Sequence, residues 1–292
     1  MFSVPLSFQE VWRESQYPNM KLGSIGATPG GALWQYQQAS GALAQGNVLS
    51  VESNTGIRFT KEAMSAISAV NTRRITDATG NFTVANMPAG WFKGGTDAAA
   101  GVRPDRYIDL GHSYYLSIVG VSSQGQFGVI YNRASDTAVD VWWMHSDDGK
   151  LDVATAANSE YVVTCNTRVA VAAAAVDIRP VGVAQRAITD EYFFWALIKG
   201  KGIALWDTAV ALGAEMALTV SSASAGEVEA YTGVATTAEL MSFVGFTATD
   251  NDDDGAGGSK ILADIDVLRN VTPENRVPLP ANLDLAWPQM YN

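Results

Sequence analysis

The sequence has little of the side-chain chemistry on which many enzymes depend. Its 292 residues include one cysteine and two histidines. With Cys165 alone the chain can form neither an intrachain disulfide nor a cysteine-based zinc site, and its apolar surroundings predict a small buried residue. Any histidine-dependent general base must be His112 or His145. Neither has a nucleophile at a recognisable spacing, so the sequence predicts structural roles for both.

Charged residues are also scarce. They make up 17% of the chain, against about 25% in a typical soluble domain. The net charge is −11, and the 19 basic residues are scattered, with no basic run longer than Arg73-Arg74. Binding of nucleic acid needs clustered Lys and Arg, so we expect no nucleic-acid partner. A surface of few charges and many small residues favours a protein covered by neighbouring subunits, with a soluble β protein carrying Ala-rich loops as the alternative.

Long hydrophobic runs and targeting signals are absent as well. The longest apolar run, Val169–Val176, is far too short to span a bilayer. The N-terminal stretch MFSVPLSFQEVWRES has no basic flank and only a short apolar run. We therefore expect neither a membrane anchor nor a secretion signal.

Short apolar strands separated by turn signals are what the sequence does contain. The stretch from Phe193 to Gly213 predicts two strands joined by a turn at Gly200-Lys201-Gly202, followed by strands at Glu215–Val220 and Glu227–Tyr231. The spacing predicts an all-β fold with one or two short helices, built from antiparallel β-barrel or sandwich regions with extended terminal arms. The tryptophans lie mostly among aliphatic residues, which predicts core or interface positions for Trp142, Trp143 and Trp195.

Several local patterns predict other elements. Thr60–Asn71 has a capping threonine and an apolar stripe of helical spacing, so it is the main predicted helix. A single helical turn is expected at Phe8–Glu14 and another at Thr236–Ser242. Residues from Thr76 to Arg106 are rich in Gly, Pro, Asn and Asp and predict a long loop with a short strand at Phe82–Val84. Asp147-Asp148-Gly149 predicts a hairpin between two strands.

These patterns divide the chain into four segments. Residues 1–20 form a predicted N-terminal arm that docks on another surface and is not a core element. Residues 21–180 form an N-terminal and central β region, and residues 181–270 a C-terminal barrel-like region. Residues 271–292 form a predicted extended tail, since four prolines deny it a helix. Its apolar residues Trp287, Met290 and Tyr291 are the candidate contacts with a partner, and packing of the tail on its own barrel is the alternative.

One acidic loop has the spacing of a candidate metal site. Asp250, Asp252 and Asp254 occupy positions 1, 3 and 5, and Gly255 position 6, as in the first half of an EF-hand-like calcium loop. The twelfth position is Ile261, so Asp264 or Asp266 would have to complete the ligands. A solvated hairpin tip is the alternative, in which case the protein needs no cofactor.

Two stretches of the predicted C-terminal region resemble tailed-phage capsid decoration (cement, or head-stabilising) proteins. In Tyr192–Ser222 an aromatic strand with FFW, a Gly-Lys-Gly turn and a second strand precede a short strand ending in serine. The sequence EVEAYTG and then FVGFTATDNDDDGAGGSKILADIDV continue the similarity, which covers residues 181–270.

The resemblance implies a bacteriophage virion structural protein without catalytic residues. It would be made in the host cytoplasm, bind the exterior of the capsid as a homo-oligomer, with a trimer favoured, and stabilise the major capsid protein shell through multivalent contacts. Another virion component, such as a tail- or fibre-associated adhesion module, is the alternative. A hydrolytic enzyme is the third, and it would need clustered acid and base groups.

Overall fold

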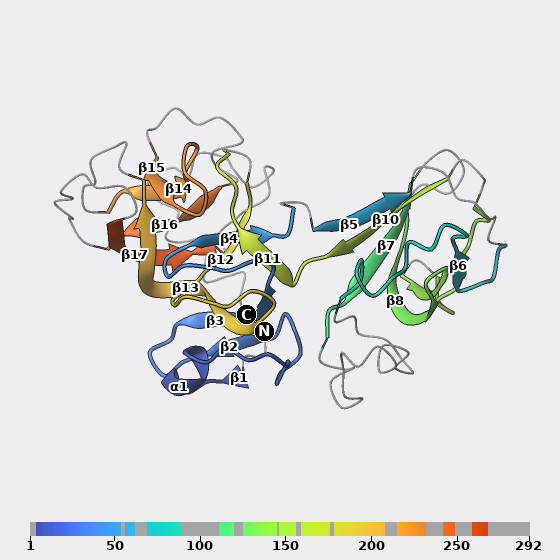
Figure 1. Ribbon diagram of the computed structural model, residues 1–292, viewed down its shortest axis with the longest axis horizontal. Coiled ribbons are helices and arrows are strands. Elements are labelled where there is room, and N and C mark those ends of the chain that lie inside the picture. Colours follow the sequence, from blue (N-terminus) through green and yellow to red (C-terminus); the bar gives the residue numbers. More distant parts are fainter. Residues whose placement is uncertain are drawn as a thin grey trace, which may run out of the picture.

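The computed structural model describes residues 4–53, 56–61, 69–88, 111–119, 125–144, 146–155, 159–175, 178–207, 215–231, 242–248 and 259–267. These residues form two lobes, seen side by side in Figure 1. The larger or main lobe holds an 11-stranded sheet, and the other lobe holds a 6-stranded sheet. The one α-helix among the described residues is α1, Phe8–Val11. The predicted all-β class is confirmed.

The main lobe is organised around β13, a single strand of 14 residues from Phe193 to Trp206. Every residue from Phe193 to Ile198 is buried, because both faces of this half are covered. Phe194 and Ala196 belong to one buried apolar cluster, and Phe193 and Trp195 to another. A strand covered on both faces has a continuous apolar sequence rather than an alternating one, which accounts for the run FFWALI.

The first half of β13 closes a ring of five strands, the first ring. Strand pairing runs from β13 to β3, β11, β4, β12 and back to β13. Closure into a barrel leaves no unpaired edge within the ring. The members besides β13 are β3 (Leu33–Ala39), β4 (Val48–Val51), β11 (Arg168–Val171) and β12 (Pro180–Val183).

The second half of β13 closes another five-stranded ring, the second ring. Here the pairing runs from β13 to β15, β14, β16, β17 and back to β13. Only the β13–β15 pair in this ring is parallel. The other members are β14 (Ala217–Val220), β15 (Val228–Ala230), β16 (Phe243–Thr247) and β17 (Ser259–Asp266).

The predicted hairpin turn at Gly200-Lys201-Gly202 is therefore wrong, because β13 continues through it. Lys199 pairs with Leu33 of the first ring and also with Asp266 of the second. Gly200 has a φ of +121°, and a Cβ placed there would lie 3.1 Å from the Cα of Ala32. The glycines thus let the strand pass closely over Ala32 as it changes partners.

The N-terminal segment packs on the main lobe instead of extending to a partner. Its helix α1 begins after Ser7, whose side chain and that of Glu10 form a capping box. Leu6 and Val11 are buried in the same apolar cluster as Trp195. Strands β1 (Val4–Pro5) and β2 (Ile25–Ala27) extend the sheet beyond β3. For residues 4–20 the prediction of an arm that is not part of the core is therefore wrong, while the helical turn is confirmed.

The second lobe is inserted into the first ring between β4 and β11, and we call it the inserted lobe. Its six strands lie in the order β5, β10, β7, β8, β9, β6, all paired antiparallel. One face of the sheet covers a core that includes Trp143, Tyr161 and Cys165. The strands are β5 (Ile57–Lys61), β6 (Arg74–Thr76), β7 (Tyr114–Val119), β8 (Gln126–Ser135), β9 (Ala138–Trp143) and β10 (Glu160–Cys165).

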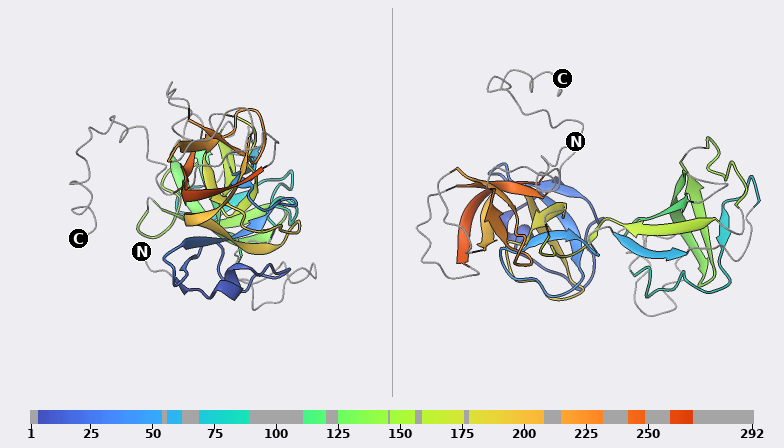
Figure 2. Two further views of the ribbon diagram at one scale, coloured as in Figure 1. Left: turned by 90° about the vertical axis from the view of Figure 1, so that its left-hand side faces the viewer. Right: turned by 90° about the horizontal axis from the view of Figure 1, so that it is seen from above.

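An antiparallel ribbon connects the lobes. In the main lobe β4 pairs with β11, and in the inserted lobe the same two chain segments continue as the pair β5 and β10. Between them the amide of Glu52 donates to the carbonyl of Arg168, and that of Cys165 to the carbonyl of Gly56, both at 2.9 Å or less. Figure 2 shows this ribbon leaving the main lobe in the view from above.

Strand pairing groups the chain differently from the predicted segments 21–180 and 181–270. The first ring joins β3 and β4 to β11, β12 and β13, so it uses residues from both segments. Residues between β4 and β11 form a sheet of their own. β12 begins at Pro180, so the predicted boundary between residues 180 and 181 falls inside the first ring and does not separate two sheets.

Other local predictions had mixed outcomes. Thr60 and Lys61 are in strand β5, so a helix does not begin at Thr60, and residues 62–68 lie outside the described residues. Residues 82–84 form no strand, although Phe82 is fully buried. The turn at residues 147–149 is confirmed, but residues 150–155 after it are not a strand. The turn predicted at Thr236–Ser242 lies outside the described residues apart from Ser242.

Replacement of Gly200 by alanine tests whether β13 needs a glycine where it changes rings. We expect Gly200→Ala to lower the free energy of unfolding by about 1–3 kcal/mol, the usual cost of holding a non-glycine residue at positive φ. Urea denaturation followed by tryptophan fluorescence measures the change. Gly30→Ala is the matched control, because a Cβ at Gly30 meets nothing within 4 Å. Equal stability of the two variants would contradict this account of β13.

Candidate functional site

His112 lies at the junction of the two lobes and is fully buried. Its Nδ1 lies 2.5 Å from Oγ1 of Thr167, and its Nε2 lies 2.6 Å from Oε1 of Gln38 in β3. Both ring nitrogens are therefore engaged by neutral side chains from the ribbon and the first ring. The predicted structural role of His112 agrees with these contacts. His145 lies outside the described residues.

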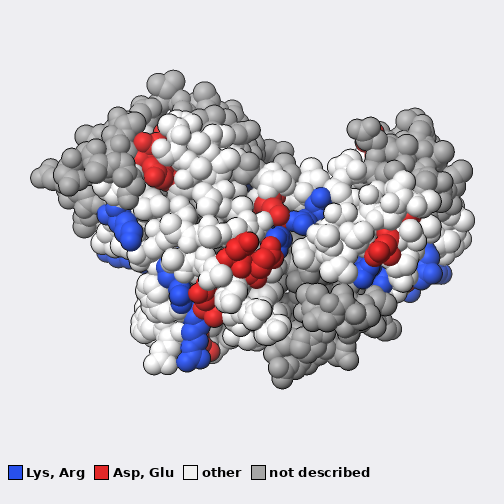
Figure 3. Space-filling model, in the orientation of Figure 1, with Lys and Arg blue, Asp and Glu red and all other residues white. Residues whose placement is uncertain are grey.

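Charged side chains surround the same junction. Arg168 donates from Nε to Glu52 at 3.0 Å and from Nη1 to Glu191 at 2.6 Å. Arg58 of β5 forms an ion pair with Glu52, which also accepts from Ser40 Oγ at 2.7 Å. Figure 3 shows acidic and basic side chains gathered where the lobes meet. Since Arg168 is nearly buried and paired on both sides, we read this cluster as a clamp that fixes the ribbon.

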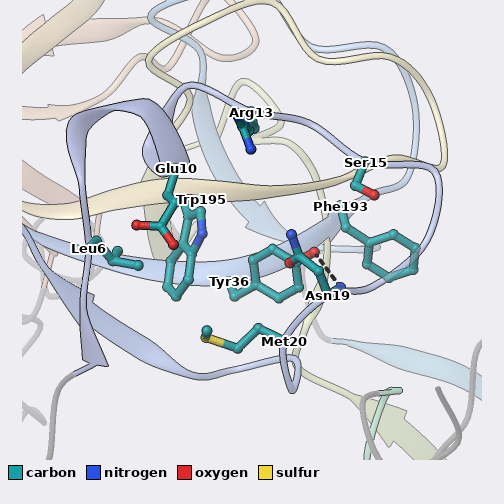
Figure 4. Close-up of a pocket in the computed structure, with 9 residues that line it drawn as sticks. All are labelled: Leu6, Glu10, Arg13, Ser15, Asn19, Met20, Tyr36, Phe193 and Trp195. Atoms are coloured by element: carbon teal, nitrogen blue, oxygen red, sulfur yellow. Dashed lines mark hydrogen bonds between the residues drawn. The ribbon is translucent and has the colours of Figure 1, made fainter. Parts of the chain in front are cut away.

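A small cavity lies between the N-terminal segment and β13, and Figure 4 shows its lining side chains. Its volume is about 170 Å³, which leaves room for one small group. Tyr36 and Trp195 form its aromatic wall, with ring centroids 5.1 Å apart, and Glu10 and Arg13 come from the N-terminal segment. Burial raises the pKa of Tyr36 to about 12. The cavity is a small gap where the N-terminal segment packs against β3 and β13 of the main lobe.

A buried carboxylate, Asp77, anchors the loop that follows β6. It accepts hydrogen bonds from the backbone and side chain of Thr79, from Asn81 Nδ2 and from Tyr161 Oη, at 2.6–3.0 Å. Burial alone would raise the pKa of Asp77, but these hydrogen bonds outweigh it and lower the pKa to about 2. The loop predicted from its Asp and Gly content is thus tied to β10.

The open side of the inserted sheet is the feature best suited to binding. Side chains alternate along strands, so those between the core residues point to the opposite face. Strand register places them in two rows that cross five strands, and we call these ten side chains the outer face. The first row is Ile57, Thr164, Tyr115, Val129 and Trp142, and the second is Thr60, Val162, Ser117, Phe127 and Met144.

The outer face carries no charged side chain. Seven of its ten side chains are aromatic or apolar, and the other three, Thr60, Ser117 and Thr164, carry hydroxyl groups. Phe127 is 40% exposed, Trp142 43% and Met144 61%. The rings of Tyr115 and Phe127 stack with centroids 5.5 Å apart. An antiparallel sheet with one face on its core usually turns polar residues to water. An uncharged, partly aromatic outer face is therefore a candidate interaction surface.

Charged groups lie beside the outer face. The guanidinium of Arg73 lies 4.4 Å from the centre of the Trp142 ring, a cation–π contact. Next to it, Arg74 of β6 forms two hydrogen bonds to Asp140 of β9, at 2.7 and 3.0 Å. Asn132 donates to the same carboxylate at 2.7 Å. The face thus has a largely apolar centre, with the Arg74–Asp140 pair along one side and Glu160 of β10 next to Val162 on the same face of the sheet.

The sequence contains a signal for this surface. In YYLSIV and FGVIY the outer residues other than Ser117 are aromatic or apolar like the core residues, whereas a half-exposed strand would alternate with polar residues. Trp142 and Trp143 were both expected in a core or an interface, and the structure separates them: Trp143 is in the core and Trp142 on the outer face. Cys165 is buried as predicted, and burial raises the pKa of its thiol.

The remaining predicted site residues are not brought together by the described structure. Asp250, Asp252, Asp254, Trp287, Met290 and Tyr291 lie outside the described residues. Of the two possible completing ligands, Asp264 pairs with Phe246 within the β16–β17 ladder, and Asp266 lies 3.6 Å from Lys199. Asp264 lies five residues after Ser259 in β17. Ala248, the last described residue before the acidic loop, donates to the carbonyl of Leu262, two residues before Asp264.

No group of three or more possible metal ligands occurs among the described residues. Nor does that part of the chain contain a helix long and apolar enough to cross a membrane. Comparisons with protein-family models, with curated proteins and with solved structures found no match.

The low pKa of Asp77 predicts a pH-dependent contribution to stability. A carboxyl whose pKa falls on folding stabilises the protein above its unfolded pKa, and this contribution is lost as the pH falls through the folded pKa. We expect Asp77→Asn to cost about 2 kcal/mol at pH 7 and progressively less between pH 4 and pH 2. Urea denaturation across this range measures the difference, with the exposed Asp147→Asn as control. A difference independent of pH would contradict the assignment.

The acidic loop can be tested for calcium directly. Because the twelfth position is Ile261 and Asp266 is already paired with Lys199, we expect equal melting temperatures in calcium and in chelator. Differential scanning fluorimetry on the chain and on its Asp250→Asn, Asp252→Asn, Asp254→Asn triple variant makes the comparison. A melting temperature that chelator lowers in the parent chain but not in the triple variant would show a calcium site instead.

Proposed function

We propose that this chain is a non-catalytic virion structural protein, a capsid decoration protein that binds outside the major capsid shell and stabilises it. The strand and turn pattern of residues 181–270 supports the proposal through its resemblance to such proteins. The observation that carries it is the outer face of the inserted lobe, an uncharged surface of mainly aromatic and apolar side chains on a protein with a net charge of −11.

The composition of the outer face suits a protein partner. Buried centres of protein interfaces are depleted in charge and enriched in Tyr, Trp, Phe and Met, with polar groups at the rim. Tyr115, Trp142, Phe127 and Met144 supply those types, and the Arg74–Asp140 pair lies beside them. Exposed apolar patches of this kind on a soluble protein commonly mark interaction sites.

Such a protein would act through burial and repetition. Each contact between copies, or between a copy and the shell, can be modest, because a symmetric assembly repeats it many times. Once one contact forms, the next is intramolecular, and the apparent affinity rises far above that of a single contact. A rigid inserted lobe held by the Arg168 clamp would project the outer face at a constant angle in every copy.

Co-sedimentation with empty shells of the source particle tests the proposal. We expect the chain to bind shells, and the double variant Phe127→Glu, Met144→Glu to bind at least tenfold more weakly, because charges on the outer face would remove a repeated apolar contact. The control is Val70→Glu, Val153→Glu, which places two charges at similarly exposed positions, 45% and 47%, outside the outer face.

The same material separates the alternatives. Failure of the parent chain to bind shells would overturn the proposal. Binding to intact host cells or cell-surface glycans without binding to shells would favour an adhesion module of the tail or fibre. Equal loss of shell binding in both double variants would show that the outer face has no special part.

A further inference from the structure

Two features of the chain bear on how copies of it could contact one another. One is the outer face, whose ten side chains are uncharged although four of the large apolar ones, Ile57, Phe127, Trp142 and Met144, are at least 40% exposed. The other is the tail after Val267, where the description of the structure ends. The tail is 25 residues long (268–292).

The composition of the tail matches the outer face. Between Val277 and Asn292 there is one charged residue, Asp284, and there are three prolines. Prolines hinder helix and central strand formation, so this segment is poorly suited to building a core of its own. Backbone already restricted by proline loses less conformational entropy on docking. Its large apolar residues are Leu279, Leu283, Leu285, Trp287, Met290 and Tyr291.

The position of β17 favours docking on another copy. Figures 1 and 2 show β17 on the side of the main lobe away from the inserted lobe. The tail follows β17, so it starts far from its own outer face. Fully extended, 25 residues reach on the order of 80 Å, enough to cross to a neighbouring molecule.

We propose that the tail of one copy, residues 277–292, docks through Trp287, Met290 and Tyr291 on the outer face of the inserted lobe of a neighbouring copy. Apolar tail side chains would cover Tyr115, Phe127 and Trp142, while Arg73 and Arg74 border the contact. Such a contact is heterologous, since two different surfaces meet, and it generates rings or extended arrays of copies. The inference deepens the proposed function by naming the link between copies, but it does not depend on binding to a shell.

Photo-cross-linking in the full-length chain tests the contact without any shell. Trp287 is replaced by the photoreactive residue p-benzoylphenylalanine, and the purified chain is irradiated in solution. We expect a covalent species of twice the chain mass under denaturing conditions, and peptide mapping that joins residues 277–292 to segments 111–119, 125–144 or 159–165. Linkage within one copy would keep the mass of a single chain, so the gel separates the two arrangements.

The variants described above serve as controls in the same chain. Phe127→Glu, Met144→Glu should reduce the cross-linked dimer at least tenfold, whereas Val70→Glu, Val153→Glu should leave its yield unchanged, with melting curves verifying that both are folded. Cross-links confined to one copy, cross-links to the main lobe, or no cross-linked dimer would each overturn the inference. Shell binding is measured in a separate experiment. A chain that fails to bind shells can therefore still show the cross-linked dimer, and a chain that forms no dimer can still bind shells.

Discussion

Burial of β13 on both faces is the constraint on which the main lobe depends. Phe193 to Ile198 are buried between two apolar clusters, so the strand cannot shift without exposing one of them. Its two halves close two rings of strands, and Gly200 and Gly202 lie where it passes from one ring to the other. The N-terminal segment covers the face of β13 that carries Phe193 and Trp195, since Leu6 and Val11 pack in the same cluster. The cavity beside Tyr36 lies between this segment and β13.

The inserted lobe depends in turn on the ribbon that leaves the first ring. Glu52 and Arg168 lie at neighbouring positions of that ribbon and are joined by backbone and side-chain hydrogen bonds. Removal of one partner from a nearly buried ion pair usually costs more than the pair contributes, because the other charge stays buried. The clamp therefore sets how the inserted lobe is presented, while the sheet beyond it, anchored by Asp77 and Tyr161, carries the outer face.

Local patterns in the sequence were enough to predict the class of the fold and some of its strands. Short apolar runs bounded by turn residues identified β14 and β15, which were predicted at Glu215–Val220 and Glu227–Tyr231. What failed depended on distant pairing. The sequence Gly200-Lys201-Gly202 is equally compatible with a hairpin turn and with a bend inside one strand. The structure has a bend, because β13 pairs with β3 before these residues and with β17 through and after them. Thr60 is a good helix cap by itself, but pairing with Val162, far along the chain, makes it part of a strand.

The same limit applies to the candidate site. The boundary near residue 180 could not be corrected from composition, because the first ring combines strands from before and after the inserted lobe. Apolar residues on both faces of β7 and β8 could have indicated the outer face. Its continuity across five strands could not be predicted, because it depends on the register in which the strands pair. His112 could be predicted as structural from its isolation, whereas its position between Gln38 and Thr167 required the fold.

We propose that the outer face of the inserted lobe is a protein contact that links copies on a virion. A cryo-EM reconstruction of shells saturated with the chain tests it most directly. The account predicts inserted lobes that reach neighbouring copies, with density covering Tyr115, Phe127 and Trp142. Decorated shells in which these side chains face open solvent in every copy would contradict it.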